Sequence, residues 1–183
     1  KAVRSLETGV CHIYHKKFDE MHTADMLEYI RKATDDRLYA IAELIRRGVD
    51  PGLIYDRTKI DMFFLEKIKN IVEFEPEVKA APMNVDVLRD AKRMGFGDKF
   101  IAKLWNVNEI DVFNFRKEKG IFPVYRMVDT CHTNAYIPYF YSSYTGENAS
   151  KLTDKKKIVV LGAGPIRIGQ GVEFDYSTVH AIW

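Results

Sequence analysis

The glycine-rich stretch VVLGAGPIRIGQGVEFDYS, residues 159–177, holds residue types suited to binding a phosphate or another oxyanion. Glycine lets a ligand approach the backbone closely, and an arginine can pair with an oxyanion. The spacing excludes two common phosphate motifs, because G-x-G-x-x-G needs glycine where Arg167 stands and a P-loop needs lysine where Gln170 stands. Two interpretations stay open, an active-site-edge loop and a tight packing turn with a solvated arginine. The candidate loop residues are Gly162, Gly164, Arg167, Gly169 and Gly171.

Two groups of cysteine and histidine carry the ligand types that zinc prefers. Cys11, His12 and His15 lie near the start, and Cys131 adjoins His132. The first group lacks Cys-x₂₋₄-Cys spacing, and adjacent side chains diverge on an extended chain. We therefore expect no metal site, but buried cysteines and surface histidines. Two cysteines also make no disulfide framework in a chain of 183 residues, which favours a reduced, cytoplasmic protein.

The stretch FIAKLWNVNEIDVFNFRKEKG, residues 100–120, has the outline of a helix-turn-helix. Its second helix would begin with Asn108, Glu109 and Asp111, and carboxylates there repel phosphate. The net charge of +2 is also too balanced to indicate a partner such as nucleic acid or a membrane surface. A helical nucleic-acid-binding domain is therefore the alternative function rather than the favoured one.

The elements that must position these groups are mostly helical. Between residues 20 and 120 the apolar residues recur with a helical period, which predicts five or six short helices and no strand. Residues expected at helix ends are Thr23, Asp35, Asp36, Arg46, Arg47, Gly48, Pro51, Gly95, Asp98, Asn108 and Gly120. The longest helix, roughly 60–79, should end or kink at Pro76. Its expected buried face consists of Phe64, Leu65, Ile68, Ile71 and Val72.

The character of the sequence changes at Ile121, where residues typical of extended chain and strands begin. An aromatic cluster there should cover the helical domain or seal it against a neighbouring domain, rather than form a ligand platform. It consists of Tyr136, Tyr139, Phe140, Tyr141 and Tyr144. A polar linker, 145–157, precedes a buried-type strand pattern, KIVVLGAG, and residues 172–183 should begin a further helix or extended segment. A lone strand without its sheet cannot bury both faces or pair its backbone groups, so we expect residues after about 157 to be poorly ordered or packed in a non-native way.

Several of these blocks resemble the carbamoyl-phosphate synthetase large subunit family. GAGPIRIGQGVEFDYSTVHA, residues 162–181, resembles the opening of its second synthetase half, to which the form RIGQG belongs. VYRMVDTC and AYIPYFYSSY are similar to the segment before that half, and RSLETG to the end of the first half. IDMFFLEKI, LRDAKRMGFGD and IAKLW resemble the helical oligomerisation domain. The blocks match in order and spacing over nearly the whole chain, whereas CHIYHKKFDEMH and HTNAYIP match no family pattern.

The resemblance implies an enzyme, a ligase, with two homologous ATP-grasp halves that makes carbamoyl phosphate from bicarbonate, glutamine-derived ammonia and two ATP. It implies ATP, Mg²⁺ or Mn²⁺ and K⁺ as cofactors of the intact enzyme. It also implies a glutamine amidotransferase small subunit as partner, and a product used in arginine and pyrimidine synthesis. The ATP-grasp domains would lie outside residues 1–183, so no catalytic, cofactor-binding or metal-ligand residue transfers to a position here.

The sequence as a whole is interpreted as an excised piece of a longer chain, since it lacks an initiator methionine and opens in the last turns of a helix. It shows no signal peptide and no apolar run of about 18 residues. We predict a mainly α fold: the end of the first half at 1–9, a compact helical oligomerisation domain at 10–150, and a linker with the truncated start of an α/β domain at 151–183. Its expected role is non-catalytic, joining the flanking halves and self-associating.

Overall fold

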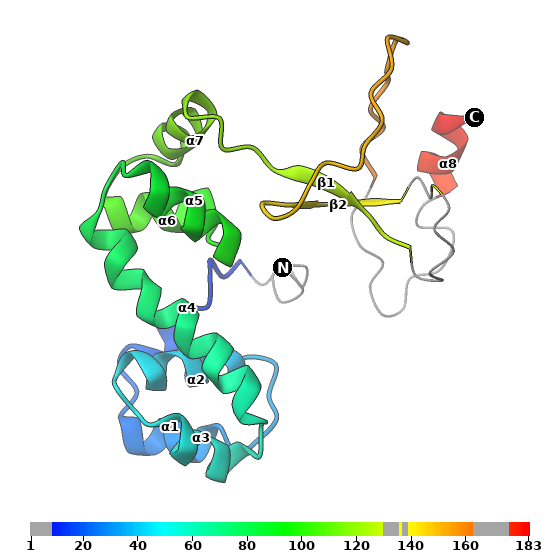
Figure 1. Cartoon of the computed structure of the whole chain (residues 1–183). Helices are drawn as coiled ribbons and strands as arrows, with labels where there is room; N and C mark the ends of the chain where they lie inside the picture. The colour runs from blue at the N-terminus through cyan, green and yellow to red at the C-terminus, as the bar shows by residue number, and fades with distance from the viewer. Residues whose placement is uncertain (1–8, 130–135, 137–138, 163–175) are drawn as a thin grey trace. The chain divides into compact units, whose positions relative to one another are not determined.

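The computed structural model describes residues 9–129, 136, 139–162 and 176–183 (Figure 1). The chain divides into a larger unit, Lys1–Ala149, and a smaller unit, Ser150–Trp183, and each is described by itself. The described part of the larger unit holds a short 3₁₀ turn, seven α-helices and two strands. The predicted mainly α fold is confirmed. Residues 20–120, all of them described, hold seven α-helices rather than five or six.

The first three helices form one end of the larger unit. They are Thr23–Tyr29 (α1), Arg37–Arg46 (α2) and Pro51–Thr58 (α3), and they follow the 3₁₀ turn Lys16–Phe18 (η2). Pro51 occupies the first turn of α3, and the side chain of Asp50 accepts a hydrogen bond from the Gly52 amide. Gly48 has φ of +80° just beyond α2, a conformation that favours glycine. Thr23 was expected as the cap of α1, but it is the first helical residue and His22 precedes it.

The long helix α4, Met62–Ala80, runs from the group α1–α3 to the group α5–α7 (Figure 1). Its range agrees with the predicted 60–79, but Pro76 does not end it, since the helix continues for one more turn and buries Val78. Leu65 and Val72 are buried as predicted. Phe64 is not: 59% of its surface is exposed, because the first turn of α4 lies at the edge of the packed helices.

The remaining helices form the second group. They are Val85–Met94 (α5), Asp98–Trp105 (α6) and Glu109–Glu118 (α7). Gly95 and Gly120, predicted as stops, both have positive φ just beyond a helix. Asn108 forms a capping box with Asp111, as its position predicted. Asp98 is not the cap of α6, since Gly97 takes that position and the Asp98 side chain points into an ion-pair network.

The core consists of two apolar clusters, one in each helical group. The first is centred on α2 and includes Phe18, Met26, Ile30, Ile41, Leu44, Ile54, Leu65 and Val72. The second is centred on α6 and includes Val78, Leu88, Phe96, Phe100, Ile101, Trp105, Val112 and Ile121. Because α4 contributes to both, it is the helical element that joins them.

The extended segment after α7 contains strands β1, Val124–Met127, and β2, Phe140–Ser143, which pair antiparallel with Val124 opposite Ser143. This confirms the predicted strand-like pieces. Of the aromatic cluster, Tyr144 packs against the second apolar cluster, whereas Tyr139 is 69% exposed. Tyr136 and Tyr141 are also exposed. Tyr144 therefore covers the helices as predicted, whereas the three exposed tyrosines do not, and their seal against a neighbouring domain stays a prediction.

The smaller unit contains α8, Tyr176–Ile182, which agrees with the predicted helix near the C-terminus. The buried-type strand pattern at KIVVLGAG forms no strand in its described part, residues 157–162. Ile158, Val159 and Leu161 are 90%, 81% and 87% exposed. A buried parallel strand needs neighbours on both sides to pair its backbone groups, and no described strand pairs with these residues. No helix among the described residues is long and apolar enough to cross a membrane.

Candidate functional site

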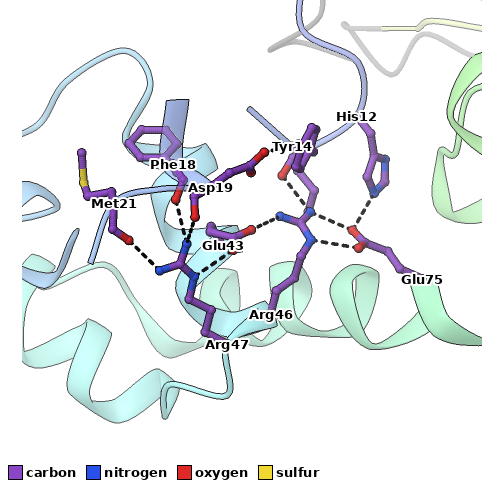
Figure 2. A network of polar contacts seen from close by, with 10 residues as sticks. His12, Tyr14, Phe18, Asp19, Met21, Glu43, Arg46, Arg47 and Glu75 are labelled. Atoms are coloured by element: carbon purple, nitrogen blue, oxygen red, sulfur yellow. Dashed lines mark hydrogen bonds and ion pairs between the residues drawn. The ribbon is translucent and has the colours of Figure 1, made fainter. Parts of the chain in front are cut away.

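Arg47, at the end of α2, holds the chain segment that leads into the helices (Figure 2). Its guanidinium donates to the carbonyl oxygens of Met21 at 2.6 Å, Phe18 at 2.7 Å and Asp19 at 2.9 Å. Its Nε donates to Glu43 at 2.9 Å. One side chain therefore fixes the backbone of residues 18–21 against α2, which a lysine with its single ammonium could not do in the same fork geometry.

Arg46, the neighbouring residue, connects α2 to α4 (Figure 2). Its Nε and Nη2 donate to the two carboxylate oxygens of Glu75 at 2.9 and 2.8 Å, and Nη2 also donates to the Ile13 carbonyl at 2.9 Å. Burial opposes ionisation of Glu75, but Arg46 and His12 together outweigh burial and lower the pKa of this carboxyl. Arg46 and Glu75 form a bidentate, mostly buried ion pair that connects α2 to α4, and Arg46 also binds the segment before the helices.

His12 lies where the two apolar clusters meet. Its ring stacks on Phe100 with centroids 4.0 Å apart and lies 4.5 Å from Phe96. Its Nε2 is 3.3 Å from a Glu75 oxygen without forming an aligned hydrogen bond, and its side chain is only 6% exposed. The expectation of a surface histidine is therefore wrong for His12, because the leading segment folds back across the second cluster.

The residues around His12 contact both clusters. Val10 and Ile13 pack on the first cluster, and Cys11 packs on the second. His12 itself has φ of +61°, an uncommon conformation for a residue other than glycine, which the surrounding contacts maintain. Residues 10–13 therefore form a second link between the clusters, beside α4.

The cysteine and histidine residues do not assemble into a metal site in the part of the chain that the structure describes. The imidazole of His15 instead accepts a hydrogen bond from the Lys17 amide and begins the η2 turn. Cys131 and His132 lie outside the described residues.

A second ion-pair network holds the segment that leaves the helices. Lys92 of α5 donates to Asp98 at 2.6 Å, and Arg116 of α7 donates to the other Asp98 oxygen at 2.7 Å. Arg116 also donates to the Ile121 carbonyl at 3.3 Å, and Lys92 to the Phe96 carbonyl at 2.8 Å. Burial opposes ionisation of Asp98, but its two cationic partners outweigh burial and lower its pKa.

Further contacts strengthen this end of the molecule. The Trp105 indole donates to the Val78 carbonyl at 2.6 Å and so fastens α6 to the end of α4. The Lys92 ammonium lies 4.9 Å from the centre of the Tyr144 ring, and burial raises the pKa of the Tyr144 hydroxyl. The chain after α7 is thus held at Ile121 and again at Tyr144.

Most of the glycine-loop candidates lie outside the described residues. Gly162 is described and exposed. Gly164, Arg167, Gly169 and Gly171 lie outside the described residues, so an active-site-edge role for this loop stays a prediction.

The helix-turn-helix outline corresponds to α6 and α7. The start of α7 carries Glu109 and the capping Asp111, and the guanidinium of Arg116 is engaged by Asp98. Negative charge at the N-terminal end of a helix that would read DNA disfavours contact with phosphates. The described geometry offers this alternative no support.

Comparison with protein families identifies the helical unit. Residues 1–120 match the family described as carbamoyl-phosphate synthetase large chain, oligomerisation domain. The chain belongs to this family. Residues 154–183 match the carbamoyl phosphate synthase preATP-grasp domain, which agrees with the resemblance of the glycine block. The polar networks of the carbamoyl-phosphate synthetase oligomerisation domain lie almost entirely within the first match.

Sequence reasoning missed the residues that hold this domain together. Arg46 and Arg47 were expected only as favourable charges at a helix end, and Glu75 and Lys92 were not singled out. A weak signal existed in two adjacent arginines followed by glycine, a combination that also suits any solvated helix end. Their partners come from segments about thirty residues away, and spacing along the chain cannot reveal such pairings.

Proposed function

We propose that the helical unit is a non-catalytic connector of the synthetase, which keeps the chain segments on either side of it in fixed relation and associates with another copy. The observation that carries this proposal is the pair of anchors: Arg47 holds residues 18–21, and Arg116 with Tyr144 holds the chain after α7. The family description as an oligomerisation domain supports the association.

The proposal extends to the intact enzyme. Family membership supports a ligase that makes carbamoyl phosphate from bicarbonate, glutamine-derived ammonia and two ATP, with Mg²⁺ or Mn²⁺ and K⁺ at its ATP sites. It also supports a glutamine amidotransferase small subunit as partner and a role in arginine and pyrimidine synthesis in the cytoplasm. We place no catalytic, cofactor-binding or metal residue in the helical unit, whose buried charged groups are committed to ion pairs with one another.

The decisive experiment compares chemistry with association in the same sample. The 183-residue chain should form no carbamoyl phosphate and hydrolyse no ATP, and it should self-associate in sedimentation experiments at micromolar to millimolar concentration. Carbamoyl phosphate formation by this chain would overturn the non-catalytic assignment. A salt-dependent shift of duplex DNA in a gel would instead favour the nucleic-acid-binding alternative.

A further inference from the structure

An apolar surface at the start of α4 has no partner among the described residues. Phe63 and Phe64 are 61% and 59% exposed, and their rings meet edge to face with centroids 5.4 Å apart. Exposing apolar aromatic surface to water is unfavourable, so a contact that buries these two rings is favoured. Adjacent exposed aromatic side chains of this kind are typical of a contact surface.

A hollow of about 440 Å³ adjoins these rings. Its apolar wall comes from Leu38, Ile41, Ile60, Phe64, Ile68 and Ile71. Phe64 lines the hollow and its ring meets that of Phe63, so one face of the domain carries two exposed aromatic rings and a recess with an apolar wall. A face that offers both an apolar side chain and an apolar recess can bind an identical face through a twofold contact.

The charges that line the hollow are also suited to contact with an identical surface. Asp35, Arg37 and Lys67 all belong to its lining. Asp35 and Arg37 make no ion pair within the described residues, and the Lys67 ammonium lies 5.1 Å from the centre of the Phe63 ring. Unpaired charges of both signs beside one apolar recess are arranged to meet opposite charges on a second identical surface.

We propose that a second copy of this chain docks on the face formed by Asp35, Phe63, Phe64 and Lys67, through a twofold contact. Phe63 of each copy enters the hollow of the other, and Lys67 of each copy meets Asp35 of the other. This assignment rests on the self-association proposed above and names the surface that performs it. In a twofold contact each pair occurs twice, so one charge reversal creates two repulsions.

The test uses charge reversal in two separate chains. Asp35→Lys alone and Lys67→Asp alone should each weaken self-association at least tenfold in sedimentation equilibrium, because like charges then face each other twice. A one-to-one mixture of the two variants should recover the wild-type dissociation constant as a mixed dimer, because both cross-copy pairs are then attractive. Recovery in the mixture cannot come from a contact within one chain.

Matched controls distinguish the loss of this face from general effects of a substitution on the protein. Phe63→Ala should also weaken association, whereas Phe122→Ala, at a phenylalanine that is 54% exposed elsewhere, should leave it unchanged. Lys79→Asp changes the charge of another exposed lysine of α4 and should likewise have no effect. Circular dichroism verifies that each variant keeps the helical content of the wild type.

The outcomes are distinguishable. If the wild type associates and both charge-reversed variants associate equally well, this face is wrong while the proposed self-association stands. If both variants are monomeric and their mixture stays monomeric, the reciprocal Asp35–Lys67 contact is wrong. If the wild type is monomeric at millimolar concentration, the proposed self-association itself fails, and this assignment with it.

Discussion

At the scale of single residues, the two adjacent arginines at the end of α2 have different partners. Arg46 binds a carboxylate of another helix, and Arg47 binds main-chain carbonyls of the leading segment. Carbonyl oxygens keep their position whatever the side chains of residues 18–21 are. Apart from its contact with Glu43, Arg47 therefore anchors a stretch of backbone rather than a particular side chain.

Replacing Arg47 tests this anchor. Arg47→Met keeps much of the aliphatic stem but removes the donors to three carbonyls, and we expect the free energy of unfolding to fall by about 2 kcal/mol. The matched control is Arg57→Met, since Arg57 is 44% exposed and its one ion pair among the described residues, with Glu28, is long at 4.0 Å. The control should change stability by less than about 0.5 kcal/mol in urea unfolding. Equal effects of the two variants would contradict the anchoring role.

Asp36 gives a prediction for acid conditions. Partial burial opposes its ionisation, but hydrogen bonds from Lys17 and Tyr29 outweigh burial and lower its pKa to about 2. A carboxyl whose pKa is lowered on folding stabilises the protein above its unfolded pKa of about 4, and this contribution disappears as pH falls through about 2. Lys17 is 43% exposed, so solvent screening limits the contribution to about 1 kcal/mol.

The corresponding experiment follows urea midpoints from neutral pH down to about pH 2. Asp36→Asn should lower stability at neutral pH and should show a smaller loss than the wild type between about pH 4 and pH 2. Asp25→Asn is the control, at an exposed carboxyl without an ion pair among the described residues. Parallel curves for Asp36→Asn and the wild type would show that this carboxyl does not contribute.

At the scale of helices, Asp98 is the common partner of three elements. It belongs to α6 and receives hydrogen bonds from Lys92 of α5 and Arg116 of α7, and Arg116 continues to the carbonyl of Ile121. Its side chain is 12% exposed, as expected for a carboxylate between two cations. The packing of α5, α6 and α7 therefore depends on one negative charge.

Removing this charge should destabilise the second helical group. Asp98→Asn leaves two mostly buried cations without their anion, and we expect a loss of about 3 kcal/mol in the free energy of unfolding. The matched control is Asp90→Asn, which breaks an exposed pair with Arg93 and should change stability by less than about 0.5 kcal/mol. Similar losses for both variants in thermal unfolding would contradict the special position of Asp98.

At the scale of the whole helical unit, two apolar clusters are joined by α4 and by the segment around His12. One connecting helix by itself couples the unfolding of two apolar clusters only weakly. The histidine ring adds a direct contact with Phe96 and Phe100 of the second cluster, while its neighbours pack on the first. The two groups should therefore unfold together in the wild type.

His12→Ala tests this coupling through hydrogen exchange. In the wild type, amides of α2 and α6 should show similar protection, because both exchange through one global opening. In His12→Ala we expect the protection of the two helices to differ by at least tenfold, with a total loss of stability of about 1–2 kcal/mol. His15→Ala, at a histidine whose ring packs beside Phe18 and Tyr39 of the first cluster, should lower protection in both helices alike. Equal protection in His12→Ala would show that α4 suffices.

Much of the helical architecture could be predicted from the sequence, because its signals are local. Pro51, Gly95, Asn108 and Gly120 act on backbone within one turn of themselves, and each lies at a helix end as predicted. The prediction for Phe64 was wrong since the helical period places a residue on a face without telling what covers that face. The apolar pattern at 157–164 is that of a buried strand, but no strand is formed in its described part, because a strand needs neighbouring strands that the pattern itself does not supply.

The sequence by itself determined that this protein is mainly helical, where most helices end, and which family it resembles, because these depend on local propensity and on the order of motifs. Only the tertiary structure decided that His12 is buried, that Arg47 binds backbone carbonyls, and that Asp98 joins three helices. These contacts depend on which distant segments meet when the two apolar clusters form. A charge or an imidazole acquires its role from the partners that folding brings to it.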